Sequence, residues 1–411
     1  MRPYFTRERF GRPQFLAGSL LVVFLAQALW LVRAEFDSSQ SMDGAEAILI
    51  GEGLKQWRHQ GIAGAPFTDP PGNPVLHLFR SDENGFDTEH SPLLPLVTAG
   101  PLLAWPHDLS VESAPYWRWL ARLPFLACGV FLGASLWYVA RRLCGNTGGF
   151  IALTLYCFSP SVIQASAAWH TEPEILAAWG AFGTVFTAIA VAHTLYAPRE
   201  VVLWNWRRIV LLGISLAIAV GSQFSLVIVL PMALCFLLYV APVRRRAAVV
   251  IWLAASMVGL LLFVGFYFFQ FHTFRESIRH AVFWGFSLRG FAVPRVYIEI
   301  ARQIMRGFSV FALVLPVALV TYCVWPRTRY FGNTAPLIVG GLFIVFTFGH
   351  PHTAGAGFLL AAIPFLFIFV SGILADLLET EYRSVVLACV VMLLILYAGG
   401  TLFALAKASQ G

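Results

Sequence analysis

The sequence predicts an all-α, polytopic membrane protein with about eleven transmembrane helices and a large first extracytoplasmic loop that carries amphipathic helices. Hydrophobic residues make up 58% of its 411 residues and charged residues only 12%, whereas soluble domains carry about 25% charge. Apolar runs recur along the chain, each long enough to cross a hydrocarbon core about 30 Å thick. Since that core contains no water to bond with backbone groups, each run must be helical.

The order of apolar and polar stretches divides the chain into six parts. We predict a cytoplasmic basic tail (1–13), a first transmembrane helix (14–32), an extracytoplasmic acidic loop (33–117), a transmembrane core (118–270), an extracytoplasmic arginine-rich loop (271–306) and C-terminal transmembrane helices (307–411). The expected spans cover 14–32, 118–140, 148–168, 174–196, 208–220, 223–241, 247–270, 307–325, 335–349, 355–375 and 384–405.

The arginines between the spans indicate the topology. With the N-terminus in the cytoplasm, the inner loops hold arginines such as Arg141, Arg142 and Arg244. The short outer turns at about 169–173, 221–223 and 350–354 hold no Lys or Arg. This distribution obeys the positive-inside rule.

The first outer loop contains more than half of the chain's 21 acidic residues. Within it, helical spacing over Met42–Arg58 predicts an amphipathic helix that lies on the membrane surface. Its apolar face is expected to comprise Ala45, Ile48, Leu49, Leu54 and Trp57. The segment Ser91–Trp105 is apolar but short and interrupted by prolines, which indicates a second helix dipping into the interface.

Asp37 and Asp43 follow the first helix, where a water-soluble group and a lipid head group can meet. A carboxylate there can act as a general base towards a hydroxyl or hold a divalent metal ion. The alternative is that both are solvated loop charges. Asp43 and Glu46 also open the amphipathic helix, whose dipole favours an anion at that end.

A second outward acidic point is His170-Thr171-Glu172-Pro173-Glu174. Glu172 and Glu174 are candidates for chemistry, because charge at the membrane edge is expensive without a use. They can equally be capping residues of the helix that follows, with Pro173 in its first turn. His170 belongs to the same turn. His90, His350 and His352 are further candidate metal or phosphate ligands, although two histidines without a third ligand are a weak signal.

The arginine-rich loop is the candidate site for a phosphate or pyrophosphate group. Arg275 and Arg279, and Arg302 and Arg306, are each spaced to share a helix face, and guanidinium groups match phosphate oxygens. Generic attraction to anionic lipid heads is the alternative. The six arginines of this candidate site are Arg275, Arg279, Arg289, Arg295, Arg302 and Arg306.

The order of several short motifs resembles that of the GT-C fold glycosyltransferases, in particular the protein-mannosyltransferase and aminoarabinose-transferase-like branch. The resemblance is strongest over residues 14–200. The motifs are Met42-Asp43-Gly44-Ala45-Glu46-Ala47, His90-Ser91-Pro92-Leu93-Leu94-Pro95-Leu96, Ala121-Arg122-Leu123-Pro124, Ala140-Arg141-Arg142-Leu143-Cys144-Gly145, Phe158-Ser159-Pro160, Glu172-Pro173-Glu174 and His350-Pro351-His352.

The resemblance implies transfer of a sugar from a polyprenyl-phosphate carrier to a lipid, glycan or protein acceptor at the outer face of a bacterial inner membrane. It places the essential loop carboxylate on Asp43 and the second acidic point near Glu172 or Glu174. The family often has Glu after the first acid, whereas Gly44 stands here. The later outer loop would hold the donor phosphate. Membrane lipids are expected partners and nucleic acid is not. A divalent metal ion stays open as a cofactor.

A second class of protein stays open beside the enzyme. The chain could be a non-catalytic accessory subunit of a membrane complex, or a transporter of lipids or solutes. The expected spans are nearly free of ionisable residues, which argues against ion-coupled transport. Gly44 keeps the accessory subunit open, since it could mark a lost active site.

Overall fold

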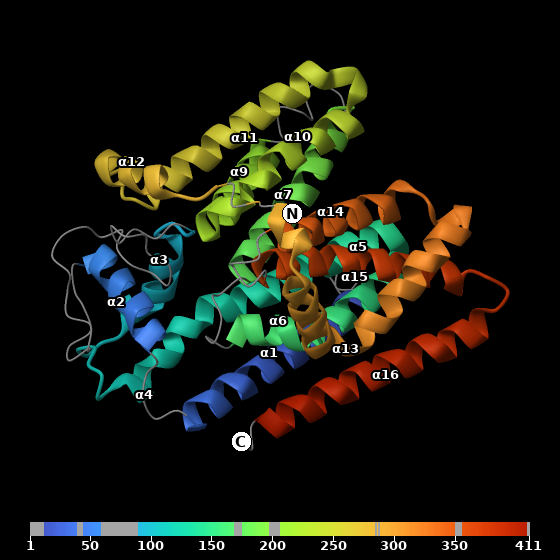
Figure 1. Cartoon of the computed structure of the whole chain (residues 1–411), viewed down its shortest axis with the longest axis horizontal. Helices are drawn as coiled ribbons and strands as arrows, with labels where there is room; N and C mark the ends of the chain where they lie inside the picture. The colour runs from blue at the N-terminus through green and yellow to red at the C-terminus, as the bar shows by residue number, and fades with distance from the viewer. Residues whose placement is uncertain are drawn as a thin grey trace, which may run out of the picture. The chain divides into compact units, whose positions relative to one another are not determined.

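The computed structural model describes residues 12–38, 44–58, 89–167, 175–196, 206–283, 286, 288–349 and 356–408 (Figure 1). These residues form helices and connecting turns and contain no strand. The chain divides into two compact units. Unit 1 comprises residues 1–38, 126–171 and 286–411, and unit 2 comprises residues 39–125 and 172–285.

Unit 1 is built around one buried helix, α15 (Ala356–Leu378). Every side chain from Phe358 to Ile373 is buried, and α13, α14 and α16 pack against this helix. The other helices of unit 1 are α1 (Arg12–Ser38), most of α5 (Leu123–Cys157), α6 (Pro160–Ala167), α13 (Pro294–Val324), α14 (Phe331–Gly349) and α16 (Arg383–Ala408), with 3₁₀ turns η5 (Leu288–Ala292) and η6 (Pro326–Thr328).

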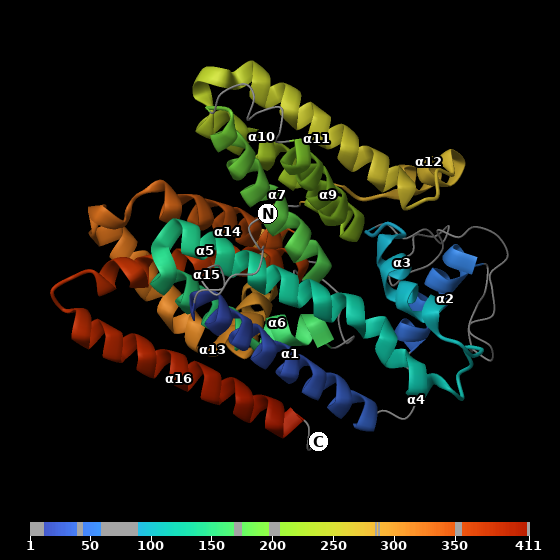
Figure 2. The ribbon, with the colours of Figure 1, turned by 180° about the vertical axis from the view of Figure 1, so that it is seen from behind.

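Unit 2 combines a bundle of apolar helices with the helices of the acidic loop (Figure 2). In the bundle, α9 packs against α7 and α11, and α7 also packs against α10. The elements of the bundle are α7 (Ile175–Thr194), α9 (Trp206–Ser222), η3 (Phe224–Ile228), α10 (Val229–Val240), η4 (Pro242–Arg244), α11 (Arg245–Gly265) and α12 (Phe271–His280). Those of the loop are α2 (Gly44–Arg58), α3 (Leu93–Ala99), η1 (Gly100–Ala104), α4 (Ala114–Trp117) and η2 (Arg118–Arg122).

The helices confirm a multi-pass membrane protein. Seven helical segments in the described part of the chain are long and apolar enough to cross a membrane. One of them, Ala114–Cys157, contains a break at Cys144 and Gly145, where Gly145 has φ 71°. This left-handed conformation suits glycine, and it separates the predicted spans 118–140 and 148–168. The predicted total of eleven spans stays a prediction.

Two boundaries differ from those predicted. Helix α1 runs on to Ser38, so Asp37 lies on its last turn and not in a loop. Helix α13 begins at Pro294 and not near 307. Proline is suited to the first turn of a helix because its missing N–H is not needed there. Most of the predicted arginine-rich loop is therefore helical, as α12, η5 and the start of α13.

The amphipathic helix predicted over Met42–Arg58 is confirmed as α2, but its buried face packs inside the protein. Leu49 and Leu54 are 0% and 2% exposed, and α2 packs against α3. A Cβ atom added to Gly53 would collide with the backbone oxygen of Pro95 and with the Cβ of Ala99. Leu49 and Leu54 of the predicted apolar face are therefore covered inside the protein and Trp57 is exposed, and a position of this helix on the membrane surface stays a prediction.

Gly53→Ala should loosen the packing of α2 on α3 and lower the temperature of thermal unfolding, because the added methyl group meets backbone. Gly51→Ala on the same helix is the matched control, since nothing lies within 4 Å of its added Cβ. Replacing a helical glycine there should stabilise by about 0.5–1 kcal/mol. Equal unfolding temperatures for the two variants would contradict the close packing at Gly53.

Candidate active site

A buried ion-pair cluster lies at the N-terminal end of α2. The Glu46 carboxylate oxygens face two different arginines, with Oε2 3.3 Å from an Nη of Arg118 and Oε1 3.7 Å from an Nη of Arg122. The three side chains are each at most 4% exposed. We call this group the Glu46 cluster. Charges buried this deeply are tolerated when they are paired.

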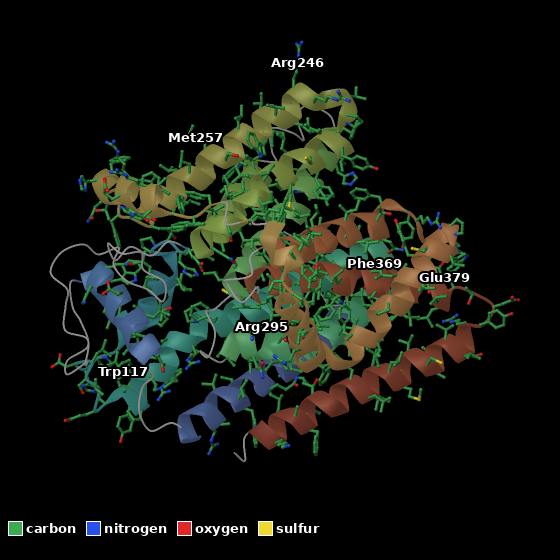
Figure 3. All side chains as sticks on the ribbon, in the orientation of Figure 1. Trp117, Arg246, Met257, Arg295, Phe369 and Glu379 are labelled. Atoms are coloured by element: carbon green, nitrogen blue, oxygen red, sulfur yellow. The ribbon has the colours of Figure 1, made fainter. Side chains whose placement is uncertain are left out.

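Local sequence explains why these charges meet. Glu46 lies in the first turn of α2, where the helix dipole favours an anion. Arg118 and Arg122 bracket the 3₁₀ turn η2. The short helix before it is held by Trp117, which is fully buried and donates its indole N–H to Ser113 Oγ at 3.0 Å. Figure 3 labels Trp117 at the end of unit 2 that carries α2 and α4.

The Glu46 cluster fixes the helix that directly follows Asp43 in the sequence. Asp43 itself lies outside the described residues, as do Glu172, Glu174, His170, His350 and His352. The backbone of Asp37 is described as part of α1, but its side chain is not. The structure therefore describes the ion pairs that hold the start of α2, the helix that follows Asp43 in the sequence. Sequence analysis did not identify Arg118 and Arg122 as site residues, because their partner Glu46 lies about 70 residues earlier in the sequence. The motif Ala121-Arg122-Leu123-Pro124 was the one feature of the sequence that pointed to Arg122.

The stretch of the acidic loop just before α3 is hydrogen-bonded to the break between α9 and η3. Ser91 donates its hydroxyl to the carbonyl oxygen of Gly221 at 2.7 Å, and the backbone N–H of Phe224 donates to the carbonyl oxygen of Glu89 at 2.8 Å. His90, between these contacts, is only 5% exposed. His90 is thus buried at this junction, and its role as a ligand stays a prediction.

The turn between α5 and α6 has its own polar supports. The turn from α5 into α6 receives two side-chain donors, Gln27 Nε2 to the carbonyl oxygen of Cys157 at 3.1 Å and Thr401 Oγ1 to that of Phe158 at 2.6 Å. These bonds satisfy carbonyl groups that a helix end leaves without partners. Helices α1 and α16 thereby hold the turn between α5 and α6.

The arginines predicted as a phosphate site fall on α12 of unit 2 and on η5 and α13 of unit 1. Arg275 and Arg279 are exposed on α12 in unit 2, and Arg295 and Arg302 are exposed on α13 in unit 1. Figure 3 labels Arg295 on α13. The side chains of Arg289 and Arg306 are not described. The helix-face prediction for Arg275 and Arg279 is confirmed, because both lie on α12.

Helix α12 and the Glu46 cluster lie at opposite ends of α2. Trp57, in the last turn of α2, packs edge-on against Phe268 with ring centroids 5.7 Å apart, and donates its N–H to the carbonyl oxygen of Leu96. Phe268 precedes α12 by three residues. At 1.5 Å per residue, the two ends of α2 are roughly 20 Å apart. Arg118 and Arg122 are therefore closer than α12 to the start of α2.

A second polar group lies where α14 begins and α15 ends. Asn333 donates its amide to Asp376 Oδ2 and to the carbonyl oxygen of Thr328, both at 3.0 Å. The hydroxyl of Tyr330 lies 3.4 Å from Asp376 Oδ1. Sequence analysis missed this group, although Asp376 follows a long apolar run and its carboxylate requires a polar partner. It joins two helices of unit 1 by a polar contact.

The described residues contain no group of three or more His, Cys, Asp or Glu side chains placed to hold a metal ion. Asp43 and Glu172, two of the expected metal ligands, lie outside those residues. The possible metal requirement therefore stays a prediction.

Known proteins resemble this chain in fold. Residues 98–268 match the family model of dolichyl-phosphate-mannose-protein mannosyltransferases. The oligosaccharyltransferase AglB from Archaeoglobus fulgidus, in complex with an inhibitory peptide and a dolichol-phosphate, superimposes with a TM-score of 0.58 at 13% identity, covering 96% of this chain and 56% of AglB. ArnT from Cupriavidus metallidurans, bound to undecaprenyl phosphate, gives 0.57 at 15% identity, covering 96% of this chain and 73% of ArnT.

These comparisons define the class of protein: the chain is a multi-pass membrane protein with the GT-C glycosyltransferase fold. Within that class it has the mannosyltransferase- and ArnT-like architecture predicted from its motifs. The chain spans just over half the length of the archaeal oligosaccharyltransferase. No curated protein matches it in sequence.

Glu46→Gln should destabilise unit 2, because it leaves two buried guanidinium groups without the carboxylate between them. Removing one partner of a buried ion pair costs about 3–5 kcal/mol. The measurement is unfolding by denaturant in detergent. Glu112→Gln is the control, since Glu112 is an exposed acid of the same loop. An unchanged unfolding midpoint for Glu46→Gln would show that the ion pair does not stabilise the fold.

Proposed function

We propose that this protein is a glycosyltransferase that moves a sugar from a polyprenyl-phosphate carrier to an acceptor at the extracytoplasmic face. The observation that carries the proposal is the GT-C fold, shared over nearly the whole chain with ArnT, whose structure contains undecaprenyl phosphate. A lipid-linked donor reaches its enzyme from within the bilayer. A bundle of apolar helices joined to a folded polar loop is suited to such a donor.

We assign Asp43 as the catalytic carboxylate. Its proposed role is to orient the acceptor hydroxyl or amine and to accept its proton as the sugar is transferred and the lipid phosphate leaves. Asp37 and Glu172 are the further carboxylates proposed for the site. Glu46 has a different role, because its two oxygens face buried arginines. It is a positioning residue that holds the start of α2.

The contacts of Glu46 help to interpret the position at which this chain has Gly44 and the family often has a second acid. The family often has a second acid directly after the first, and this chain has Gly44 there, with its next acid at Glu46. An acid committed to Arg118 and Arg122 supports the fold of the loop without reaching a substrate. Gly44 is therefore compatible with an active enzyme in which Asp43 acts without an adjacent acid.

We propose that arginines of the segment 271–306 hold the donor phosphate and stabilise the charge that develops as it leaves. Arg295 and Arg302 on α13 are the pair we assign first, since the α12 pair lies at the end of α2 away from the Glu46 cluster. Arg289 and Arg306 belong to the same proposed site. The sugar and the acceptor, whether lipid, glycan or protein, are to be found by experiment.

Asp43→Asn should abolish release of free polyprenyl phosphate, because the amide cannot accept a proton. The full chain in lipid nanodiscs would be incubated with a panel of polyprenyl-phosphate sugars and candidate acceptors, and the released carrier measured. We expect a loss on the order of 100-fold or more, the usual contribution of a general base. Asp108→Asn is the control, as Asp108 is an exposed acid of the same loop.

Equal release by the parent and Asp43→Asn would reject Asp43 as the catalytic carboxylate. Absence of release by the parent from every donor and acceptor pair would favour a non-catalytic subunit over an enzyme.

Arg295→Gln combined with Arg302→Gln should raise the KM for the donor by at least about tenfold, since a charged hydrogen bond contributes about 1.5–3 kcal/mol. The control is Arg207→Gln combined with Arg208→Gln, an exposed pair at the start of α9. Initial rates at varied donor concentration would be compared. A donor KM that changes equally in both double variants would argue against a specific phosphate site on α13.

A further inference from the structure

The turn between α11 and α12 holds two bulky residues in a strained conformation. Phe268 and Phe269 have φ values of 51° and 59° and are the non-glycine residues with positive φ among those the structure describes. In this left-handed region the Cβ atom approaches the neighbouring carbonyl oxygen. Helices commonly end on glycine at such a position, so two consecutive phenylalanines require an explanation.

Backbone bonds and one side-chain contact hold this turn, which we call the α11–α12 corner (residues 266–271). The N–H groups of Phe268 and Phe269 donate to the carbonyl oxygens of Gly265 and Val264, at 2.9 and 3.3 Å. Trp57 packs against the ring of Phe268. The strained conformation is thus fixed from two sides and persists with its side chains in defined positions.

The aromatic rings at the corner contribute little to the protein core. Phe268, Phe269 and Phe271 are 43%, 54% and 68% exposed. The face of α12 that packs inward uses other residues. Phe274 and Ile278 lie against the core cluster of Phe263 and Tyr267, and the Tyr267 hydroxyl hydrogen-bonds to Ser277 at 2.8 Å. Helix α12 is therefore anchored without these three rings.

The exposed side chains of α12 are mainly basic, and its one acid, Glu276, is half-buried. His272, Arg275 and Arg279 are all exposed, and their spacing of three and four residues places them along one side of the helix. The rings and the basic side chains together form a surface that is apolar at one end and cationic along the helix.

The position of this surface in the membrane follows from α11. The apolar segment Pro242–Gly265 is long enough to span a bilayer. On this segment, Met257, Leu260 and Leu261 are each at least 50% exposed. Met257 points away from the bundle (Figure 3). Because the span ends at Gly265, the corner follows at the boundary between hydrocarbon and head groups, where aromatic side chains are favoured.

We propose that the α11–α12 corner and the exposed basic side chains of α12 together form a docking surface for anionic phospholipids. Phe268, Phe269 and Phe271 enter the boundary of the acyl chains, and Arg275 and Arg279 bind the phosphates of the head groups above them. Glycine would relieve the strain but would remove the rings from the lipid. The surface lies at the end of α2 away from the Glu46 cluster.

The test measures which lipids stay bound to the purified full chain. Native mass spectrometry would follow the protein in detergent with an equimolar mixture of phosphatidylglycerol and phosphatidylcholine, and in a second arm with undecaprenyl phosphate. Arg275→Gln combined with Arg279→Gln should lower the ratio of bound phosphatidylglycerol to phosphatidylcholine on the order of tenfold. The control, Arg275→Lys with Arg279→Lys, keeps both charges and should keep most of this preference.

An unchanged lipid ratio in the glutamine variant would overturn the proposal. Loss of undecaprenyl phosphate with phosphatidylglycerol retained would also overturn it, and would assign α12 to the donor instead. This readout is independent of catalysis, so it does not depend on the proposed transferase activity.

A second variant, Phe269→Gly, tests the strained turn and keeps the contact between Phe268 and Trp57. We expect less bound phosphatidylglycerol and an unfolding temperature in detergent that is unchanged or higher, because glycine adopts positive φ without strain. A lower unfolding temperature with normal lipid binding would show that the ring serves packing within the protein, against the proposal.

Discussion

The buried contact of Glu46 with Arg118 and Arg122 is the constraint on which unit 2 depends. Charges this far from water must keep their partners, so the start of α2 cannot separate from η2 without a large cost. Other contacts extend this constraint. Gly53 brings α2 against α3, Ser91 attaches the chain before α3 to the end of α9, and Trp57 reaches Phe268. A loop of mainly polar sequence is thereby part of a folded unit.

In unit 1, hydrogen bonds at helix ends hold neighbouring helices together. In a bilayer, an apolar side chain is about as well solvated by lipid as by another helix. Close packing and hydrogen bonds therefore determine which helices associate. Gln27 and Thr401 bond to carbonyl groups at the turn between α5 and α6. Asn333 and Asp376 join α14 to α15. Each contact lies at a helix end or break, where the backbone or a neighbouring side chain still offers a polar partner.

Much of the fold could be predicted from sequence because the signals are local. Apolar length and helical spacing predicted α2, α7, α15 and α16 closely, and the gap between the predicted spans 118–140 and 148–168 coincides with the break at Gly145. The partners of Glu46 could not be predicted in this way, because they lie far along the chain. Periodicity showed that α2 has an apolar face, but it could not distinguish burial against α3 from contact with lipid. Asp43 and Glu172 stay predictions from resemblance.

Burial distinguishes arginines that the sequence presents as equivalent. Arg118 and Arg122 are enclosed with a carboxylate, so they serve the architecture of the loop, and phosphate could reach them only by breaking a buried ion pair. Arg275, Arg279, Arg295 and Arg302 are exposed and can bind phosphate while the fold stays intact. The residues around them then distinguish the two arginines of α12 from the two of α13. Those of α12 follow exposed phenylalanines at the end of a span, which suits a lipid surface. Those of α13 lie on another unit, after a turn whose Phe286 and Phe291 pack against rings of α14. In the proposed transferase, the α13 arginines would serve the lipid-linked donor and the α12 arginines the bilayer around it.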